Sequence, residues 1–255
     1  MRHSIIAFCT FFAALAATAC SPRAEPPATA GVTTRSGSAP RAEVVAPLFP
    51  ALEAKLSGWE GMGPSGTPEH RAKLEALAAV IREQRLAGHE AQLVFVCTHN
   101  SRRSQMAQLL MAAAARRAGL SGVTTFSAGT ERTAFNPRAV AALRRAGLAV
   151  ETTAAGDNPR YTVRLGDGGP ALSAFSKRLD DPESPKAGFV AVMTCSQADA
   201  ACPFVPGADR RIAIPYDDPK VADGTPEETA RYDERVEQIG RDMMWVARAA
   251  AKQTH

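Results

Sequence analysis

A cysteine and an arginine stand six positions apart, where an apolar run ends and a helical pattern begins. Residues 93–97 (LVFVC) are followed by a short polar loop and then by apolar residues at helical spacing, which predicts a strand, a tight loop and a helix. Backbone N–H groups at such a junction bind tetrahedral oxyanions. The same positive field favours a thiolate at Cys97. The guanidinium of Arg103 fits two oxygens of a phosphate-like anion.

The sequence therefore predicts a nucleophilic thiol inside an oxyanion-binding loop. Ser104 is placed to donate a hydrogen bond to the thiolate. The residues assigned to this loop, called the oxyanion loop below, are Thr98, His99, Asn100, Ser101, Arg102, Arg103 and Ser104.

Strand-like and helix-like segments alternate from residue 92 onward, which favours a parallel sheet with helices on both faces. The Gly-, Pro- and Asp-rich stretch 156–184 is interpreted as a long connection that forms a flap near the site. Because ligands bind beyond the carboxyl ends of parallel strands, Cys97, Cys195 and the loop after Pro215 are expected at one edge. The expected strands are 92–97, 123–127, 189–195 and 211–215, and the expected helices are 104–118, 137–147 and one that starts after residues 225–228.

An attack by a thiolate on an oxyanion requires a proton for the departing oxygen. Asp218 follows the fourth expected strand and is the predicted general acid, with Asp217 as the alternative. The sequence Asp-Asp-Pro is also typical of a simple turn.

The cysteines of this chain suggest a second role for thiols. Of the five, Cys9 belongs to a predicted signal peptide and Cys20 to a predicted lipidation site, which leaves Cys97, Cys195 and Cys202. An odd count in an exported protein suggests a Cys195–Cys202 pair and one reactive thiol. The pair could be a permanent disulfide, two small buried side chains, or a relay that resolves an adduct on Cys97.

The N-terminal residues predict export. A short basic start, an apolar run and the sequence Ala-Thr-Ala-Cys20 are typical of a lipoprotein signal peptide over residues 1–20. Ordinary cleavage, or a start at Met62 that would keep the protein in the cytoplasm, are the alternatives. The expected location is the periplasmic face of a membrane, with a lipid anchor at Cys20 as the one membrane contact. The expected order is a tether at 21–45, a helical extension at 46–90 and the main domain at 91–252.

The composition is that of an ordinary globular protein, with 45% hydrophobic and 22% charged residues. The formal net charge of +4 suits small anions, and a few basic pairs do not indicate nucleic acid. A small oxyanion is therefore the expected partner of the site.

Residues 92–250 resemble the low-molecular-weight tyrosine-phosphatase superfamily, and within it they look like the thioredoxin-coupled arsenate reductases. Plain phosphatases share the cysteine loop and the Asp-Pro but lack the later cysteine pair. The resemblance implies a flavodoxin-like fold with a four-stranded parallel sheet. It is carried by the motifs at 96–107 (VCTHNSRRSQMA), 127–130 (SAGT), 135–139 (FNPRA), 194–195 with 202–203, and 217–219 (DDP).

The resemblance implies that Cys97 attacks arsenate held by Arg103, that Asp218 protonates the leaving oxygen, and that Cys195 and then Cys202 take over the disulfide. A thioredoxin-like dithiol would regenerate the enzyme. Phosphatase activity through a cysteinyl phosphate is the alternative, and a tethered oxyanion-binding or redox-sensing module is the non-enzymatic one. The resemblance also implies that Asn100 fixes the shape of the loop.

Three positions depart from the family pattern or bear on the substrate. His99 stands where the reductases have glycine and is expected to have no chemical role. Gln108 replaces an acidic residue often tied to potassium, so no metal and no cofactor are predicted. Phe135 either lines the pocket for phenyl substrates or packs in the core.

Overall fold

The computed structural model describes residues 46–252 of the 255-residue chain. The predicted signal peptide, the lipidation site at Cys20 and the tether at 21–45 lie outside the described residues, so they stay predictions. None of the described helices is long and apolar enough to cross a membrane.

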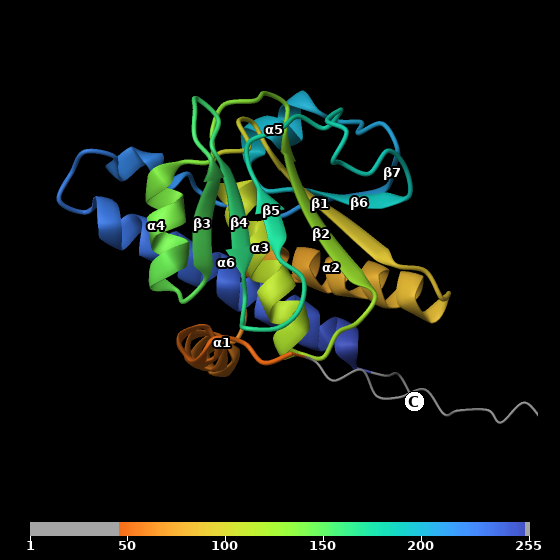
Figure 1. Cartoon of the computed structure of the whole chain (residues 1–255). Coiled ribbons are helices and arrows are strands. Elements are labelled where there is room, and N and C mark those ends of the chain that lie inside the picture. Colours follow the sequence, from red (N-terminus) through yellow and green to blue (C-terminus); the bar gives the residue numbers. More distant parts are fainter. Residues whose placement is uncertain (1–45, 253–255) are drawn as a thin grey trace, which may run out of the picture. The chain divides into compact units, whose positions relative to one another are not determined.

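A four-stranded parallel sheet forms the centre of the domain (Figure 1). The strand order is β2-β1-β6-β7, and the last residue of β1, Cys97, lies opposite Gly129 of β2. Nearly every side chain of β1 is buried, as in sheets that are covered on both faces. These features confirm the predicted α/β fold. The strands are β1 (Ala91–Cys97), β2 (Val123–Gly129), β6 (Phe189–Met193) and β7 (Ala208–Ala213).

Helices cover the two faces of this sheet unequally. Leu93 and Phe95 of β1 pack in the larger core, to which helices that precede and follow β1 in the chain contribute. Val94 and Val96 point to the other face, where the apolar cluster includes Ala198 of the short helix α5. This alternation follows from the two-residue period of a strand. The helices that follow β1 are α3 (Arg103–Arg117), α4 (Pro137–Arg145), α5 (Ser196–Ala201), the 3-10 helix η1 (Pro219–Ala222) and α6 (Glu228–Ala251).

Two further helices, α1 (Pro50–Met62) and α2 (Pro68–Leu86), precede the first strand. The Thr67 side chain caps α2 by accepting a hydrogen bond from the N–H of His70 at 3.3 Å, and Pro68 occupies the first turn. The apolar faces of both helices belong to the larger core of the sheet. The contributing side chains are Leu52, Leu56, Trp59, Leu74, Leu77 and Ile81.

The stretch 156–184, predicted as a long connection that forms a flap near the site, contains regular secondary structure. It contains two strands, which join a preceding strand in an antiparallel sheet. Buried and exposed side chains alternate along β4, but the glycines and prolines on either side hide this pattern in the sequence. Beyond β5 the chain returns to the central sheet, where the main chains of Lys177 and Leu179 hydrogen-bond with Gly129. The three strands are β3 (Ala149–Ala154), β4 (Arg160–Arg164) and β5 (Leu172–Ala174).

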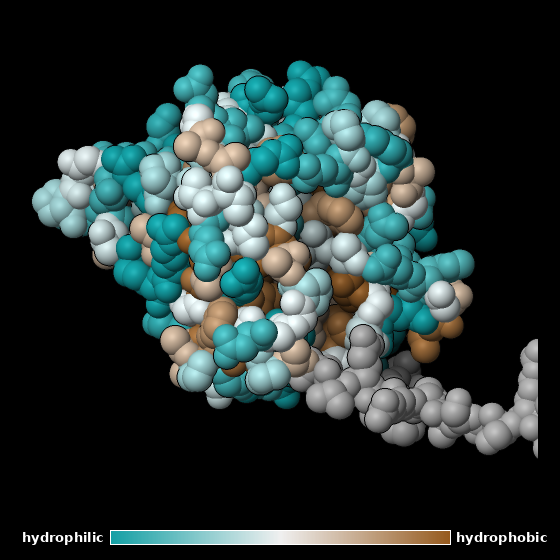
Figure 2. Space-filling model, viewed as in Figure 1, coloured by the Kyte–Doolittle hydropathy of each residue, from teal (hydrophilic) through white to brown (hydrophobic). Residues whose placement is uncertain are grey.

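An apolar hollow of about 600 Å³ lies beside the amino-terminal end of β2. Apolar side chains, brown in Figure 2, are visible on this face of the molecule. Cys97 pairs with the opposite end of β2, so the hollow is separate from the oxyanion loop. Its apolar lining includes Ala112, Ala115, Leu120, Val123, Leu165 and Leu172.

Gly240 in α6 provides a test of how tightly α1 packs on the domain. A Cβ at Gly240 would lie 2.4 Å from a ring carbon of Trp59, whose side chain is buried. Alanine normally stabilises a helix interior by about 1 kcal/mol relative to glycine, but here the ring must move. We expect Gly240→Ala to lower the free energy of unfolding by about 1–3 kcal/mol, as overpacking does, measured by urea unfolding.

The control is Gly58→Ala in α1, where a new Cβ would meet nothing within 4 Å. This variant is expected to be unchanged or more stable by up to about 1 kcal/mol. An equal gain in stability for both variants would show that Trp59 does not pack on α6 as described.

Candidate active site

The loop between β1 and α3 holds Cys97 at the carboxyl edge of the sheet. Cys97 is buried, and its Sγ lies 3.0 Å from the Oγ of Ser104. The residue that precedes α3, Arg102, makes no side-chain capping bond, so its side chain does not occupy the first N–H groups of the helix. The thiol and the helix N-terminus thus occur together, as an oxyanion site requires.

Asn100 determines the shape of the oxyanion loop. Its φ of 46° lies in the left-handed region, which asparagine adopts more readily than most residues. The Asn100 Nδ2 donates to Ser104 Oγ at 2.8 Å, while its Oδ1 accepts from Gln105 Nε2 at 3.1 Å and from the N–H of Lys177 at 2.8 Å. The side chain therefore makes the hydrogen bonds that the family resemblance implied.

Gly129 allows a second segment to approach the oxyanion loop closely. A Cβ at this position would lie 2.7 Å from the carbonyl oxygen of Thr98, 2.8 Å from the nitrogen of Asn100 and 2.4 Å from the carbonyl oxygen of Glu131. No side chain fits there without displacing main chain. This close approach explains the glycine in the motif at 127–130.

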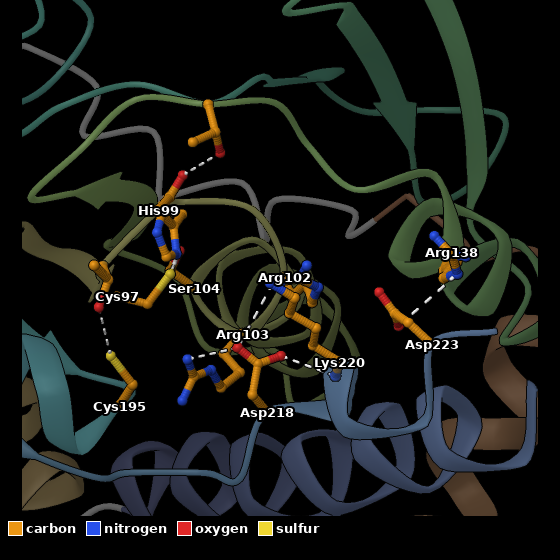
Figure 3. Close-up of polar contacts among 12 residues, drawn as sticks. Cys97, His99, Arg102, Arg103, Ser104, Arg138, Cys195, Asp218, Lys220 and Asp223 are labelled. Carbon is orange, nitrogen blue, oxygen red and sulfur yellow. Dashed lines mark hydrogen bonds and ion pairs between the residues drawn. The ribbon is translucent and has the colours of Figure 1, made fainter. Parts of the chain in front are cut away.

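Arg103 links the oxyanion loop to the predicted general acid (Figure 3). Its Nη1 donates to the carbonyl oxygen of Tyr216 at 3.0 Å, and its Nη2 donates to Asp218 Oδ2 at 2.8 Å. The Arg103 Nε is buried and has no hydrogen-bond partner within residues 46–252. Buried donors are nearly always paired, so this atom is suited to receive an oxygen of a bound anion.

The geometry favours Asp218 over Asp217. The Asp218 side chain is 26% exposed and lies against Arg103. The Asp217 side chain is 97% exposed, and its one ion pair within residues 46–252 is with Arg235, at 3.9 Å. Asp218 also accepts a hydrogen bond from the N–H of Lys220 at 3.1 Å, which fixes its direction at the start of η1.

Two other residues of the oxyanion loop, Arg102 and His99, make contacts outside the loop. The Arg102 Nε donates to the hydroxyl of Tyr232 in α6 at 3.0 Å, and its Nη1 is 3.6 Å from Asp218. The His99 imidazole is half-exposed and lies 3.4 Å from a carboxylate oxygen of Glu131. Arg102 therefore lies beside the predicted general acid, whereas His99 lies at the surface.

The three later cysteines are all free thiols. Cys195 is fully buried, and its Sγ lies 3.5 Å from Thr98 Oγ1 and accepts a hydrogen bond from the N–H of Ala198 at 3.3 Å. Cys202 is partly exposed at the other end of α5. The structure therefore brings Cys195 to the oxyanion loop.

The permanent Cys195–Cys202 disulfide, one of the sequence-based alternatives, is not formed in this structure. The reason is geometric. The six residues of α5 separate the two cysteines, and at about 1.5 Å per residue they span about 9 Å. A disulfide requires Cα atoms no more than about 7 Å apart, so this bond requires α5 to unwind.

Comparisons with known proteins identify the family of this chain. The family model for the low molecular weight phosphotyrosine protein phosphatase matches residues 92–163. An arsenate reductase of Bacillus licheniformis is 30% identical over 149 residues, which cover 58% of this chain and 88% of that protein. The chain belongs to the low-molecular-weight phosphotyrosine protein phosphatase family. Membership confirms the resemblance predicted from the motifs and the prediction of an enzyme.

Other relatives of this phosphatase family show similar coverage. An arsenate reductase of Halalkalibacterium halodurans is 29% identical over 150 residues, 58% of this chain and 89% of that protein. A solved structure of a YwlE mutant from Bacillus subtilis has a TM-score of 0.42 at 21% identity, over 62% of this chain and 96% of that one. The thioredoxin-dependent arsenate reductase Cg_ArsC1' of Corynebacterium glutamicum has a TM-score of 0.35 at 21% identity, over 74% and 78%.

Gln108, which stands where the reductases are expected to have an acidic residue, is buried in α3. Within residues 46–252, no three His, Cys, Asp or Glu side chains form a group that could hold a metal ion. The Gln108 Nε2 donates to the carbonyl oxygen of Thr125 at 3.3 Å. The side chain at this position thus makes a structural contact.

Sequence reasoning missed several residues that support the site. Ser176 donates from its Oγ to the carbonyl oxygen of His99 at 2.9 Å, and Gln105 donates to the carbonyl oxygen of Phe175 at 2.7 Å. Ser176 and Phe175 belong to the stretch 156–184, in which no family motif could be aligned. Tyr216 could have been suspected, since it stands directly before the Asp pair.

Lys177, whose main-chain N–H donates to Asn100, has a buried side chain. Its Nζ lies 4.5 Å from the centroid of the Phe175 ring. Burial, only partly offset by attraction to Glu183, lowers the pKa of Lys177 from 10.5 to about 8. Below pH 8 the folded protein holds a charge that burial disfavours. The cost disappears as the pH rises from about 8 toward 10.5, where the unfolded chain binds more protons than the folded one.

We therefore expect Lys177→Met to raise the free energy of unfolding near pH 7, by up to about 3 kcal/mol. The gain should shrink progressively toward pH 10.5 and can be followed by urea unfolding at several pH values. The exposed Lys55 supplies a control, because Lys55→Met should show no such pH dependence. A gain for Lys177→Met that is independent of pH would contradict the buried-charge explanation.

Proposed function

We propose that the protein is a thiol-dependent arsenate reductase in which Cys97 attacks arsenate and Cys195 and Cys202 relay the resulting disulfide. The observation that carries this proposal is the position of Cys195, a buried free thiol whose Sγ lies 3.5 Å from Thr98 Oγ1 in the oxyanion loop. Hydrolysis of a phosphoester requires no second thiol. The relatives at about 30% identity, which are named arsenate reductases, support this substrate.

In the first step, arsenate binds to the N–H groups of the oxyanion loop and to Arg103. The Cys97 thiolate forms a bond to arsenic, and one arsenic–oxygen bond breaks. Asp218 gives its proton to the departing oxygen, which leaves as water. The contact between Arg103 Nη2 and Asp218 Oδ2 at 2.8 Å supports this role for Asp218.

In the second step, the Cys195 thiolate attacks the Cys97 sulfur. A sulfur–sulfur bond forms, the sulfur–arsenic bond breaks, and its electron pair stays on arsenic, so arsenic is reduced by two electrons and leaves as arsenite. Two thiols become one disulfide. The N–H of Ala198 donates to Cys195 Sγ at 3.3 Å, a contact that stabilises the attacking thiolate.

In the third step, the Cys202 thiolate attacks the Cys195 sulfur and releases Cys97 as a thiolate. Because α5 holds these two cysteines apart, this step requires the helix to unwind. A thioredoxin-like dithiol then reduces the Cys195–Cys202 disulfide, and Cys202, which is partly exposed, is the accessible sulfur.

A cysteine phosphatase is the second candidate, because it would use Cys97, Arg103 and Asp218 in the same way and the matching family model bears that description. One observation weakens it for aromatic substrates. Phe135 is only 1% exposed and packs edge-on against Tyr161 with ring centroids 5.5 Å apart. It is therefore a core residue and does not stack on a phenyl group.

The electron donor depends on where the protein resides. The export and lipidation predicted for residues 1–20 would require a thiol reductant on the outer side of the membrane. Labelling with palmitate, compared between the wild type and Cys20→Ser, tests this proposal. Label that is present in both proteins, or in neither, would overturn a lipid anchor at Cys20.

The deciding experiment measures arsenate reduction with a dithiol donor beside p-nitrophenyl phosphate hydrolysis on the same preparation. We expect arsenite to form catalytically. Hydrolysis without reduction would establish the phosphatase instead. Arsenate binding without either activity would establish an oxyanion-binding module.

A further inference from the structure

A buried carboxylate in α6 connects the N-terminal helices to the active site. Asp242 is completely buried. Its Oδ1 accepts from the N–H of Ser65 at 2.7 Å, and its Oδ2 accepts from Ser65 Oγ at 3.0 Å, from His70 Nε2 at 2.7 Å and from the hydroxyl of Tyr216 at 3.0 Å. All four donors come from outside α6. A carboxylate that is removed from water needs such partners.

Tyr216 connects this carboxylate to Arg103. Its hydroxyl is bonded to Asp242, and its carbonyl oxygen accepts from Arg103 Nη1 at 3.0 Å. Two residues further along the chain, Asp218 contacts Arg103 Nη2. The position of Tyr216 therefore sets both hydrogen bonds of the guanidinium.

The Tyr216 side chain is held on more than one side. The His70 ring packs against it edge-on, with centroids 5.7 Å apart. Burial, and then the nearby Asp242 carboxylate, raise the pKa of Tyr216 well above 10.0, so its hydroxyl stays a donor. His70 and Asp242 consequently fix both the orientation and the position of the Tyr216 ring.

Half of this arrangement comes from the helical extension, which precedes the segment that matches the phosphatase family. The family match begins at residue 92, whereas Ser65 and His70 belong to the helical extension at 46–90. Without the extension, Asp242 Oδ1 would lose its one described donor and Oδ2 would keep only Tyr216. The buried carboxylate would then be poorly paired, and Tyr216 would have to move.

We propose that Ser65, His70, Asp242 and Tyr216 form a positioning site through which the extension at 46–90 orients Arg103 and Asp218. The extension thus contributes positioning residues to the active site. This inference rests on the proposed function to the extent that Arg103 binds the oxyanion substrate, whichever reaction follows.

The test measures how strongly inorganic phosphate protects Cys97 from alkylation by iodoacetamide, read for the Cys97 peptide by mass spectrometry. The half-protecting phosphate concentration is the concentration that halves the rate of Cys97 alkylation. We expect His70→Ala and Tyr216→Phe to raise it about tenfold. His70→Gln, which keeps a donor near the position of Nε2, should restore it to within about threefold of the wild type.

The matched control is Glu60→Gln. Glu60 pairs with Arg248 of α6 at 3.0 Å and with Arg117 of α3 at 2.8 Å, so it also ties the extension to the domain but touches neither Tyr216 nor Arg103. Its half-protecting phosphate concentration is expected to stay at the wild-type value. A rise like that of His70→Ala would mean that any loosening of the extension has this effect, and it would overturn the proposal.

A second measurement distinguishes positioning from a purely structural role. If His70 acts through Arg103, the effect of His70→Ala on phosphate protection should vanish in an Arg103→Lys background. An undiminished effect in that background, or wild-type protection in His70→Ala itself, would overturn the proposal. A wild-type protein that binds phosphate but reduces no arsenate would overturn the proposed function alone and leave this test intact.

Discussion

Cys195→Ser is expected to abolish catalytic arsenate reduction while hydrolysis of p-nitrophenyl phosphate stays within about twofold of the wild type. A serine hydroxyl does not displace arsenic from the Cys97 sulfur, so the loss of reduction should be at least about 10³-fold. Serine preserves the local fold, because its hydroxyl oxygen can accept the hydrogen bond that the N–H of Ala198 donates to Cys195 Sγ in the wild type. The two activities are measured on one preparation.

The amount of arsenite released per chain in the absence of any added dithiol tests the same step in a single turnover. The wild type and Cys202→Ser should each release about one arsenite per chain, because both can form one disulfide. Cys195→Ser should release none. Arsenite release by Cys195→Ser would disprove the relay, and loss of hydrolysis in this variant would show that Cys195 supports the fold of the oxyanion loop.

The parts of the site that are local in the sequence could be predicted. Cys97, Arg103 and Ser104 lie within eight residues, and the strand before them and the helix after them have clear periodicity. The choice of Asp218 could also be predicted from the parallel sheet alone. Asp218 follows a strand whose carboxyl end lies at the same edge of the sheet as Cys97.

The supporting contacts could not be predicted, because they join segments with no shared pattern. Asp242 is 172 residues from His70, and an aspartate among the charged residues of a helix gives no sign that it is buried. Lys177 meets Asn100 through its main-chain N–H, which any residue except proline could supply. Such contacts depend on tertiary packing and leave no residue-type signal.

Arg103→Lys is expected to lower kcat/KM for arsenate by about 10³-fold, although it preserves the charge. The guanidinium uses Nη1 for the carbonyl oxygen of Tyr216 and Nη2 for Asp218, and its buried Nε is left for the anion. The side chain of lysine has one nitrogen, so it cannot bind the Tyr216 carbonyl oxygen, Asp218 and the anion at the same time in fixed directions. The loss should appear in both KM and kcat, because the fork contacts the oxyanion in the bound state and in the transition state.

Arg102→Lys is the matched control for this prediction. Arg102 is the neighbouring arginine, but its Nε donates to the hydroxyl of Tyr232 and its Nη1 lies 3.6 Å from Asp218. The same substitution here removes one hydrogen bond at the rim, and we expect a loss of no more than about tenfold. Equal losses for the two variants would mean that the net positive charge of the loop, rather than the fork of Arg103, binds the oxyanion. A loss in Arg103→Lys confined to KM would assign the fork to substrate binding alone and leave stabilisation of the transition state to the N–H groups of α3.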